Sequence, residues 1–406
     1  MIKTISGQIK AKAALIDPDR YGRSDTSAMG RWFWEIDKVL LLLVTVLIAI
    51  GLIAVAAASP AAAQRYSGGN VRFSELYYFW RQLAWIAIGV PVMIAISMMP
   101  KERVRRLSLF GAAFFFVLLI FVPVIGPEHN GAKRWIEFGV GQVQPSEFLK
   151  PFFVVAMAWL LSLRELDKSL PIFPMSAIVT GAVAFLLMKQ PDFGSTIIFG
   201  SVWIAMLALA GVSLRALGIL AAAAVVGVVL AYFFYPVATT RIDGFLFGEG
   251  DNFQVENAMR TLTAGGLFGM GPGAGTRKFG LPEPHTDYIF SVIGEEFGLI
   301  ACLAIALLYL TIVSRVLIKL LDEENTFAIL AAAGLVIEFG LQALINMAVN
   351  VQIAPSKGMT LPFISYGGSS MLALSIGMGL LLAFTRRNPY LTRSPYVVKW
   401  SGEQAA

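Results

Sequence analysis

Residues 39–58 read VLLLLVTVLIAIGLIAVAAA, an apolar stretch in which Thr45 is the most polar side chain. A helix rises ~1.5 Å per residue, so about 20 such residues cross a hydrocarbon core of about 30 Å. The strands of a membrane barrel would alternate in polarity instead. The stretch therefore predicts a membrane-spanning helix.

The rest of the chain repeats this pattern. Of its 406 residues, 57% are hydrophobic and 14% are charged, and the mean hydropathy is +0.71. A water-soluble globule cannot bury so large an apolar share. We expect an all-α polytopic membrane protein with about ten transmembrane helices. The predicted spans are residues 37–58, 80–99, 107–125, 147–163, 172–188, 195–210, 214–234, 287–312, 326–349 and 362–384.

The distribution of charge predicts the orientation. An even number of spans places both ends of the chain on one side, and most of the 32 Lys and Arg residues fall in the tails and short loops of that side. The positive-inside rule then makes this side cytoplasmic. We expect cytoplasmic tails at 1–36 and 386–406 around a transmembrane domain at 37–385, in the bacterial inner membrane. The first tail is polar and lacks the apolar core and cleavage site of a signal peptide.

The longest loop, residues 235–286, is predicted to lie outside the cell membrane. Its length and its apolar residues at helical spacing indicate an ordered, functional segment. Residues 254–263 predict a short amphipathic helix at the membrane interface. Glycines at 265, 266, 269, 271, 273 and 275 then predict a tightly turning backbone.

Acidic residues follow this loop at the start of the eighth span. Asp287, Ser291 and Glu295 recur every four residues and share one helix face, and Glu296 lies beside them. Acidic groups within a span are functional candidates. From spacing alone, Asp287 is equally consistent with a helix N-cap and with a catalytic residue, and His285 is the weaker candidate for a base.

The ninth span carries a polar stripe of Glu338, Gln342, Asn346 and Asn350. Such a stripe lines either a cavity or a helix–helix contact, and the sequence leaves both open.

Basic groups on the outer side depart from the positive-inside trend. Lys133, Arg134 and Lys357 are either ordinary headgroup anchors or ligands of a polyanion such as a pyrophosphate. Small residues near the last span, including Ser365 and Ser369, serve either close helix packing or anion binding through backbone amides.

Several chemistries are excluded by missing motifs. The sequence has no GxxxxGK[ST] loop, no HExxH and no Cys/His cluster, and no serine has plausible triad partners. We therefore expect no nucleotide, haem or flavin cofactor. Nucleic acid is also unnecessary, because phospholipid contacts and topology explain the net charge of +6. A substrate activated beforehand, such as a lipid-linked sugar pyrophosphate, carries its own leaving group.

Five motifs in order resemble the SEDS family, the family of FtsW, RodA and SpoVE, over essentially all ten spans. They are residues 131–136 (GAKRWI), 144–147 (QPSE), 190–194 (QPDFG), 282–290 (PEPHTDYIF) and 361–370 (LPFISYGGSS). Phe193 and Pro284 are mild departures that remove no charged group. The long first tail, residues 271–275 (GPGAG) and Thr360 favour the cell-division branch, that of FtsW, over the elongation branch.

The resemblance implies a peptidoglycan glycosyltransferase that polymerises lipid II at the division septum. It also implies a class B penicillin-binding transpeptidase and other divisome proteins as partners, and a required aspartate at Asp287. Asp287 is then the expected base of an inverting displacement. A Mg²⁺ ion held by the pyrophosphate is a further candidate.

The remaining site predictions divide into two groups. Candidates for binding pyrophosphate or sugar are Lys133, Arg134, Lys357, His285, Glu283, Asp192, Gln190, Ser365 and Ser369, and candidates for a groove or a structural contact are Glu295, Glu296, Glu338, Gln342 and Asn346. A lipid II flippase and a non-catalytic divisome scaffold are the alternative functions.

Overall fold

A computed structural model describes residues 28–68, 72–128, 132–138, 141–247, 253–355 and 358–386. Residues Val39–Thr385 form one compact unit. Of the first predicted tail, the described part contains helix α2 (Ala28–Glu35). Almost all of the second tail lies outside the described residues.

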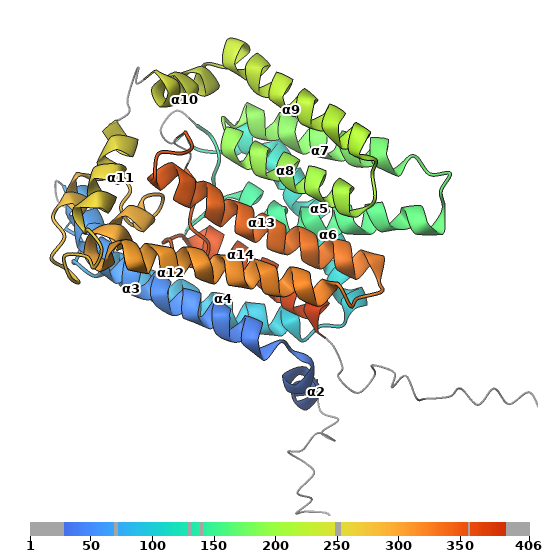
Figure 1. Cartoon of the computed structure of the whole chain (residues 1–406), viewed down its shortest axis with the longest axis horizontal. Coiled ribbons are helices and arrows are strands. Elements are labelled where there is room, and N and C mark those ends of the chain that lie inside the picture. The colour runs from blue at the N-terminus through green and yellow to red at the C-terminus, as the bar shows by residue number, and fades with distance from the viewer. Residues whose placement is uncertain are drawn as a thin grey trace, which may run out of the picture. The chain divides into compact units, whose positions relative to one another are not determined.

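Each of the ten predicted spans forms a helix (Figure 1). They are α3 (Lys38–Tyr66), α4 (Tyr77–Ser97), α5 (Lys101–Ile125), α6 (Pro145–Leu166), α7 (Ile172–Lys189), α8 (Phe193–Leu209), α9 (Leu214–Phe234), α12 (Ile289–Leu320), α13 (Thr326–Asn350) and α14 (Gly368–Thr385). Among the described residues, nine of these are long and apolar enough to cross a membrane, and α8 is a slightly shorter apolar helix. The prediction of an all-α polytopic membrane protein is confirmed.

Four predicted spans differ from the structure by six residues or more at one end. Helix α3 continues to Tyr66 rather than ending at residue 58, and α5 begins at Lys101 rather than at residue 107. Helix α12 begins at Ile289 rather than Asp287 and continues to Leu320, beyond the predicted end at residue 312. Helix α14 begins at Gly368 rather than at residue 362. The cause is a turn in which the backbone N–H of Ile364 and that of Ser365 donate to the carbonyl of Leu361.

Local sequence explains several of the other helix starts. The side chains of Asp192, Ser213 and Asn325 accept hydrogen bonds from backbone N–H groups in the first turns of α8, α9 and α13. These are the residue types that satisfy the unpaired donors of a helix N-terminus. Helix α6 instead starts with Pro145, whose missing N–H costs nothing there.

Helices α6, α13 and α14 are the most buried of the bundle. Helix α14 packs against α4 and α6, and α13 packs against α6 and α12. Helix α9 lies at the edge, and none of its residues is buried. The polar stripe predicted for the ninth span therefore lies on a central helix.

The long loop is ordered into α10 (Pro236–Leu246), α11 (Phe253–Ala264) and the short 3-10 helix η2 (Arg277–Gly280). The helix predicted at 254–263 is confirmed as α11. An antiparallel hairpin of β1 (Ile136–Phe138) and β2 (Gly141–Val143) pairs Ile136 with Val143 and was not predicted. Helices α10 and α11 lie at one end of the bundle (Figure 1).

Candidate active site

A cavity of about 1010 Å³ lies between the loops that precede α6, α12 and α14 and the ends of α3, α4 and α14. It is mixed in character, with aromatic, acidic and basic side chains in its wall. Its polar and charged lining includes Arg65, Tyr66, Tyr78, Arg81, Arg134, Glu147, Glu283, Thr286, Asp287, Ser369 and Ser370. Four of the five motifs that suggested the family thus contribute to the wall of one cavity, and the motif at residues 190–194 does not.

Asp287 lines this cavity, and two residues of the polar stripe of α13 form hydrogen bonds with its backbone. Asn346 donates its side-chain N–H to the Asp287 carbonyl at 3.0 Å, and Asn350 donates to the same oxygen at 3.1 Å. The residue before α12 is Tyr288, and no side chain caps that helix there. The N-cap interpretation of Asp287 is therefore not supported.

The segment before α14, residues 361–366, forms further hydrogen bonds with the backbone of the loop that carries Asp287. The hydroxyl of Ser365 donates to the carbonyl of Thr286 at 2.6 Å and accepts from the backbone N–H of Leu361 at 2.7 Å. The N–H of Tyr366 donates to the carbonyl of His285 at 2.8 Å. Ser365 is buried and acts on the loop backbone, whereas Ser369 lines the cavity.

Glu283 connects the loop to α3. Its carboxylate accepts a hydrogen bond from the Tyr66 hydroxyl at 2.6 Å and another from the Thr286 hydroxyl at 2.9 Å. Glu283 also lines the cavity. Its carboxylate is thus placed to hold the loop and to face a ligand.

His285 is buried among aromatic rings, with only 4% of its surface exposed. Its ring centroid lies 4.1 Å from that of Tyr78, 5.2 Å from that of Tyr366 and 6.0 Å from that of Tyr66. Burial lowers the pKa of His285 to about 3. The imidazole is therefore neutral at physiological pH, and its Nδ1 has no hydrogen-bond partner in the described structure.

Three arginines line the cavity, and among the described residues no carboxylate forms an ion pair with any of them. Arg134 is oriented by the backbone carbonyls of Gln190 and Pro191, to which its guanidinium donates. Arg81 lies beside the rings of Tyr77 and Tyr366. Lys133 is not among the lining residues, and Lys357 lies outside the described residues.

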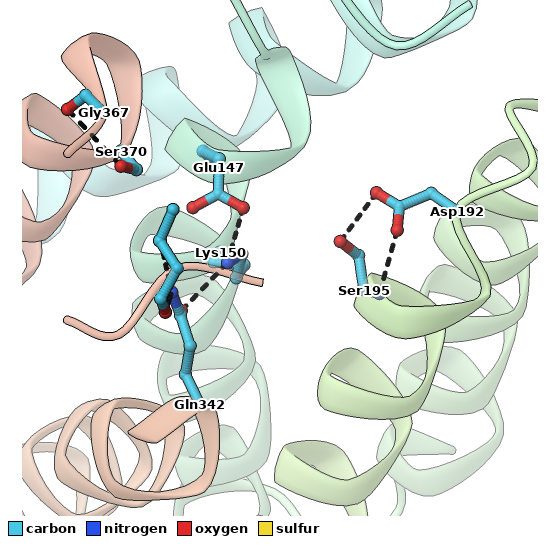
Figure 2. A network of polar contacts seen from close by, with 8 residues as sticks. Glu147, Lys150, Asp192, Ser195, Gln342, Gly367 and Ser370 are labelled. Atoms are coloured by element: carbon cyan, nitrogen blue, oxygen red, sulfur yellow. Dashed lines mark hydrogen bonds and ion pairs between the residues drawn. The ribbon is translucent and has the colours of Figure 1, made fainter. Parts of the chain in front are cut away.

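Behind the cavity, a chain of polar contacts leads into the bundle. The buried Lys150 ammonium pairs with Glu147 at 2.8 Å and donates to the side-chain amide oxygen (Oε1) of Gln342 at 3.0 Å, as Figure 2 shows. Gln342 in turn donates to the carbonyl of Thr360 at 3.1 Å. Glu147, Glu338 and Gln342 line a second pocket of only about 20 Å³.

Gln190 and Asp192 have structural contacts instead of places in the cavity wall. Gln190 donates its side-chain N–H to the carbonyl of Leu119 at 2.8 Å. Asp192 turns toward Ser195 at the start of α8 and accepts from its N–H and its hydroxyl (Figure 2). Gln190 still serves the site indirectly, because its backbone oxygen holds Arg134.

Glu295 and Glu296 also bind the protein itself. The Glu295 carboxylate accepts from the backbone N–H groups of Arg277 and Lys278 at 2.6 and 3.0 Å. Glu296 pairs with the buried ammonium of Lys278, which also donates to the carbonyl of Ala57. These two acids hold the long loop against α12, and neither lines the cavity.

A protein-made metal cage is not found in the part of the chain that the structure describes. No three His, Cys, Asp or Glu side chains come together there in a way that could hold an ion. The cavity carboxylates Glu147, Glu283 and Asp287 are the acidic groups available to a metal that arrives with a ligand.

Arg65, Arg81, Lys150 and Lys278 were missed by the sequence analysis. A signal existed for Arg81 and Lys150, because each lies one turn inside an apolar span, where an unexplained charge marks function or a buried pair. Arg65 and Lys278 lie among ordinary loop and helix-end residues, and only the fold brings them to their partners.

Comparisons with known proteins agree with this geometry. Residues 37–390 match the model of the family named for FtsW, RodA and SpoVE, which is described as "Cell cycle protein". The probable peptidoglycan glycosyltransferase FtsW of Caulobacter vibrioides is 36% identical, covering 91% of this chain and 94% of that protein. The Coxiella burnetii protein of the same name is 33% identical, covering 87% of this chain and 98% of that one.

Solved structures give the same result. A chain from a study of how a peptidoglycan synthase complex coordinates polymerization and crosslinking has a TM-score of 0.69 and 25% identity, covering 86% of this chain and 97% of its own. The rod shape determining protein RodA of Thermus thermophilus has a TM-score of 0.64 and 25% identity, covering 86% of this chain and 96% of its own. With the five motifs, the helix arrangement and these matches in agreement, the chain belongs to the FtsW/RodA/SpoVE family of SEDS membrane proteins.

Proposed function

We propose that this protein is a peptidoglycan glycosyltransferase that polymerises lipid II into glycan strands during septal cell-wall synthesis. The observation that carries the proposal is Asp287 in the wall of a cavity of about 1010 Å³ that also presents three arginines without carboxylate partners. A carboxylate beside uncompensated cations suits a reaction that needs a base for one oxygen and charge stabilisation for another.

In the proposed reaction, Asp287 removes the proton from the 4-hydroxyl of the GlcNAc of one lipid II. The hydroxyl oxygen attacks the anomeric carbon of MurNAc on the growing chain, and undecaprenyl pyrophosphate departs from the opposite face. An α-linked donor gives a β-linked product, so one inverting displacement with one base is sufficient. Asn346 and Asn350 hold the Asp287 backbone in place for this step.

Arg134, Arg65 and Arg81 are proposed to offset the charge of the departing pyrophosphate, with Lys133 and Lys357 as further outer cations. Arg134 is oriented for this role by two backbone carbonyls. Guanidinium groups bind phosphate oxygens in a bidentate manner. A Mg²⁺ ion would be held by the pyrophosphate with at most one or two protein carboxylates, such as Asp287 or Glu283.

The polar groups at membrane depth favour the polymerase over a lipid transporter. A transporter needs a polar path near the middle of the membrane. Here Lys150, Glu147 and Gln342 bind each other, and the adjoining pocket of about 20 Å³ has room for about one water molecule. A sugar pyrophosphate headgroup does not fit there.

The setting follows from the family and its relatives. We propose that the protein lies in the bacterial inner membrane at the septum with both termini in the cytoplasm, and that the cavity faces the periplasm. We also propose a class B penicillin-binding transpeptidase as its partner, with other divisome proteins. The similarity to a chain of a peptidoglycan synthase complex supports this pairing.

The test is glycan formation from purified lipid II by the protein with its cognate transpeptidase. Asp287→Asn and Asp287→Ala should lower the rate by about 10²- to 10⁴-fold, the usual contribution of a general base. Glu256→Gln, which changes an exposed carboxylate on α11 of the same loop, should keep wild-type activity. Polymer formation retained by both Asp287 variants would refute the assignment, and lipid scrambling without polymer from wild type would favour the flippase.

A further inference from the structure

Helix α14 begins at the wall of the cavity of about 1010 Å³. The residue before the helix and its first turn all line the cavity, namely Gly367, Gly368, Ser369 and Ser370. The N–H groups of Gly368, Ser369 and Ser370 have no acceptor among the described residues. The first N–H groups of a helix have no partner within the helix, so these are available to a ligand in the cavity.

The side chain of Ser369 is an independent donor at the same place. Ser369 is only 6% exposed, and its hydroxyl forms no hydrogen bond with any residue that the structure describes. The hydroxyl of Ser370 differs, because it donates to the carbonyl of Gly367 at 3.4 Å (Figure 2). A buried hydroxyl without a partner is costly unless a bound group completes its hydrogen bonding. Since Ser369 lines the cavity, that group lies in the cavity.

Gly368 has a packing role that leaves these donors free. A Cβ atom added at Gly368 would lie 2.6 Å from Cε2 of Trp85 on α4, so the indole ring lies directly against the end of α14. Close helix packing, one of the two interpretations of this motif, therefore applies to Gly368. It does not account for the hydroxyl of Ser369, which points to the other interpretation, anion binding.

A cation lies beside this helix end. Arg81 precedes Trp85 by one turn of α4, so the two side chains share a face of that helix. The guanidinium carbon of Arg81 lies 6.0 Å from the ring centroid of Tyr366, the residue before Gly367. Arg81 lines the cavity and has no carboxylate partner among the described residues. A helix N-terminus carries a partial positive charge, so both features favour an anion.

The same helix end is close to the proposed reacting centre. The N–H of Tyr366 donates to the carbonyl of His285 at 2.8 Å, and the hydroxyl of Ser365 donates to that of Thr286 at 2.6 Å. The residues just before α14 therefore contact the residues just before Asp287.

This position suits one of the two lipid-linked pyrophosphates of the proposed reaction. The bond between the anomeric carbon and the pyrophosphate oxygen breaks near Asp287, and its electron pair stays on that oxygen. The pyrophosphate of the second lipid is separated from the reacting hydroxyl by a disaccharide. A group bound at the start of α14 is therefore the departing pyrophosphate.

We infer that the amino end of α14 binds a phosphate group of the departing lipid-linked pyrophosphate, through the N–H groups of Gly368, Ser369 and Ser370 and the hydroxyl of Ser369. The inference rests on the proposed function and adds neutral donors to the guanidinium groups already assigned. Negative charge grows on the pyrophosphate as its bond to the sugar breaks. Fixed backbone dipoles stabilise such charge without reorganising, and Arg81 supplies a full positive charge beside them.

The test is equilibrium binding of undecaprenyl pyrophosphate to the full-length protein with its cognate transpeptidase in phosphatidylcholine nanodiscs. Ser369→Asp places a carboxylate among the free N–H groups, where it is compatible with the helix but repels a phosphate, so the affinity should fall by roughly tenfold or more. Ser369→Ala removes one donor and should weaken binding by about 3- to 10-fold. Ser369→Thr keeps the hydroxyl and should bind like wild type.

Ser213→Asp is the matched control. It makes the same change at the amino end of α9, and Ser213 does not line the cavity, so the affinity should not change. Undecaprenol, which has no phosphate, should bind equally to all variants, and inorganic pyrophosphate should compete only weakly.

Three results would overturn the inference. The first is unchanged affinity for undecaprenyl pyrophosphate in Ser369→Ala. The second is an equal loss of undecaprenol binding, because the lipid chain and not the phosphate would then contact this site. The third is competition by inorganic pyrophosphate as strong as by the lipid-linked form, because the site would then bind a free anion.

Thermal unfolding of each variant separates binding from folding. If Ser369→Asp does not fold, the smaller change Ser369→Ala decides the question alone. The ligand is bound without turnover, so the result is independent of polymerisation. Binding that depends on Ser369 in a protein that makes no polymer would keep this site and refute the proposed function. Polymerisation with binding that does not depend on Ser369 would refute the site alone.

Discussion

The cavity and the polar network behind it, which consists of Glu147, Lys150 and Gln342, contain the same kinds of side chain. They differ in the partners that those side chains have. In the polar network, Lys150 pairs with Glu147 and hydrogen-bonds to Gln342, and the pocket beside these residues is about 20 Å³. In the wall of the cavity of about 1010 Å³, three arginines have no carboxylate partner among the residues that the structure describes. Charges that are paired with an opposite charge inside the protein hold the fold, whereas cations whose charge no protein carboxylate offsets are available to an anionic ligand.

Among the substitutions considered, Lys150→Met should lower the stability of the folded protein most, because it removes the central residue of the polar network. The substitution removes a buried ammonium and leaves Glu147, whose side chain is 13% exposed at the cavity wall, without its cation; breaking a fully buried pair costs about 3–5 kcal/mol, which is the upper limit here. Thermal unfolding in detergent should show a large loss for Lys150→Met and a partial recovery in the double variant Lys150→Met/Glu147→Gln. Equal stability of the two variants would mean that Glu147 gains nothing from Lys150.

Asn346→Ala tests whether the polar stripe of α13 supports the position of Asp287 in the cavity. This side chain belongs to the interior stripe but donates to the carbonyls of Asp287 and Met359 at 3.0 and 2.6 Å. The change leaves the Asp287 carbonyl with Asn350 alone and removes the donor to the Met359 carbonyl. An unsatisfied buried carbonyl costs about 1–3 kcal/mol, so we expect polymerisation to slow by about tenfold through misplacement of Asp287. In the Asp287→Asn background the same change should have little further effect on the rate. Additive losses would show that Asn346 acts independently of Asp287.

The sequence predicted the ten helices because their signal is a local run of apolar residues. It also predicted that Asp287, Glu283 and Arg134 lie at one site, because their motifs fall in loops expected on the same side of the membrane, and all three line the cavity. The ends of α12 and α14 were wrong, since the turn at Leu361–Ser365 and the break in α12 at Gly298 are fixed by contacts between distant segments.

The polar stripe of α13 shows what the sequence could not decide. Spacing every four residues placed Gln342, Asn346 and Asn350 on one face, but a cavity wall and an internal contact have the same periodicity. The partners of these side chains are the carbonyls of Asp287 and Thr360 and the side chains of Lys150 and Ser291. Those partners come from other helices and loops, so only the folded chain identifies the stripe as the support of the loop that carries Asp287.

Burial of His285 among aromatic rings predicts that the stability of the protein depends on pH. Its pKa is about 3 in the folded protein and near 6.5 in the unfolded chain, so the unfolded state binds more protons between these values. The stability from His285 is complete above pH 6.5 and falls as the pH drops, by about 2 kcal/mol at pH 5. Thermal unfolding of wild type should show this decline, and His285→Phe should show less of it. The same decline in His285→Phe would assign the pH dependence to another group.

Tyr66→Phe should have the smallest effect on the polymerisation rate. It tests whether the Tyr66 hydroxyl only supports the loop or also contacts the substrate. The change removes the hydrogen bond of 2.6 Å to Glu283, which keeps its bond from Thr286, and a longer contact of 3.5 Å to the carbonyl of Pro282. Such a bond contributes about 0.5–1.5 kcal/mol, so the polymerisation rate should fall by roughly tenfold at most. Tyr235→Phe is the matched control, because the Tyr235 hydroxyl donates to the Met188 carbonyl and does not line the cavity. A loss for Tyr66→Phe as large as that for Asp287→Asn would mean that the Tyr66 hydroxyl contacts the reacting sugar, and the boundary between supporting and catalytic groups would move to α3.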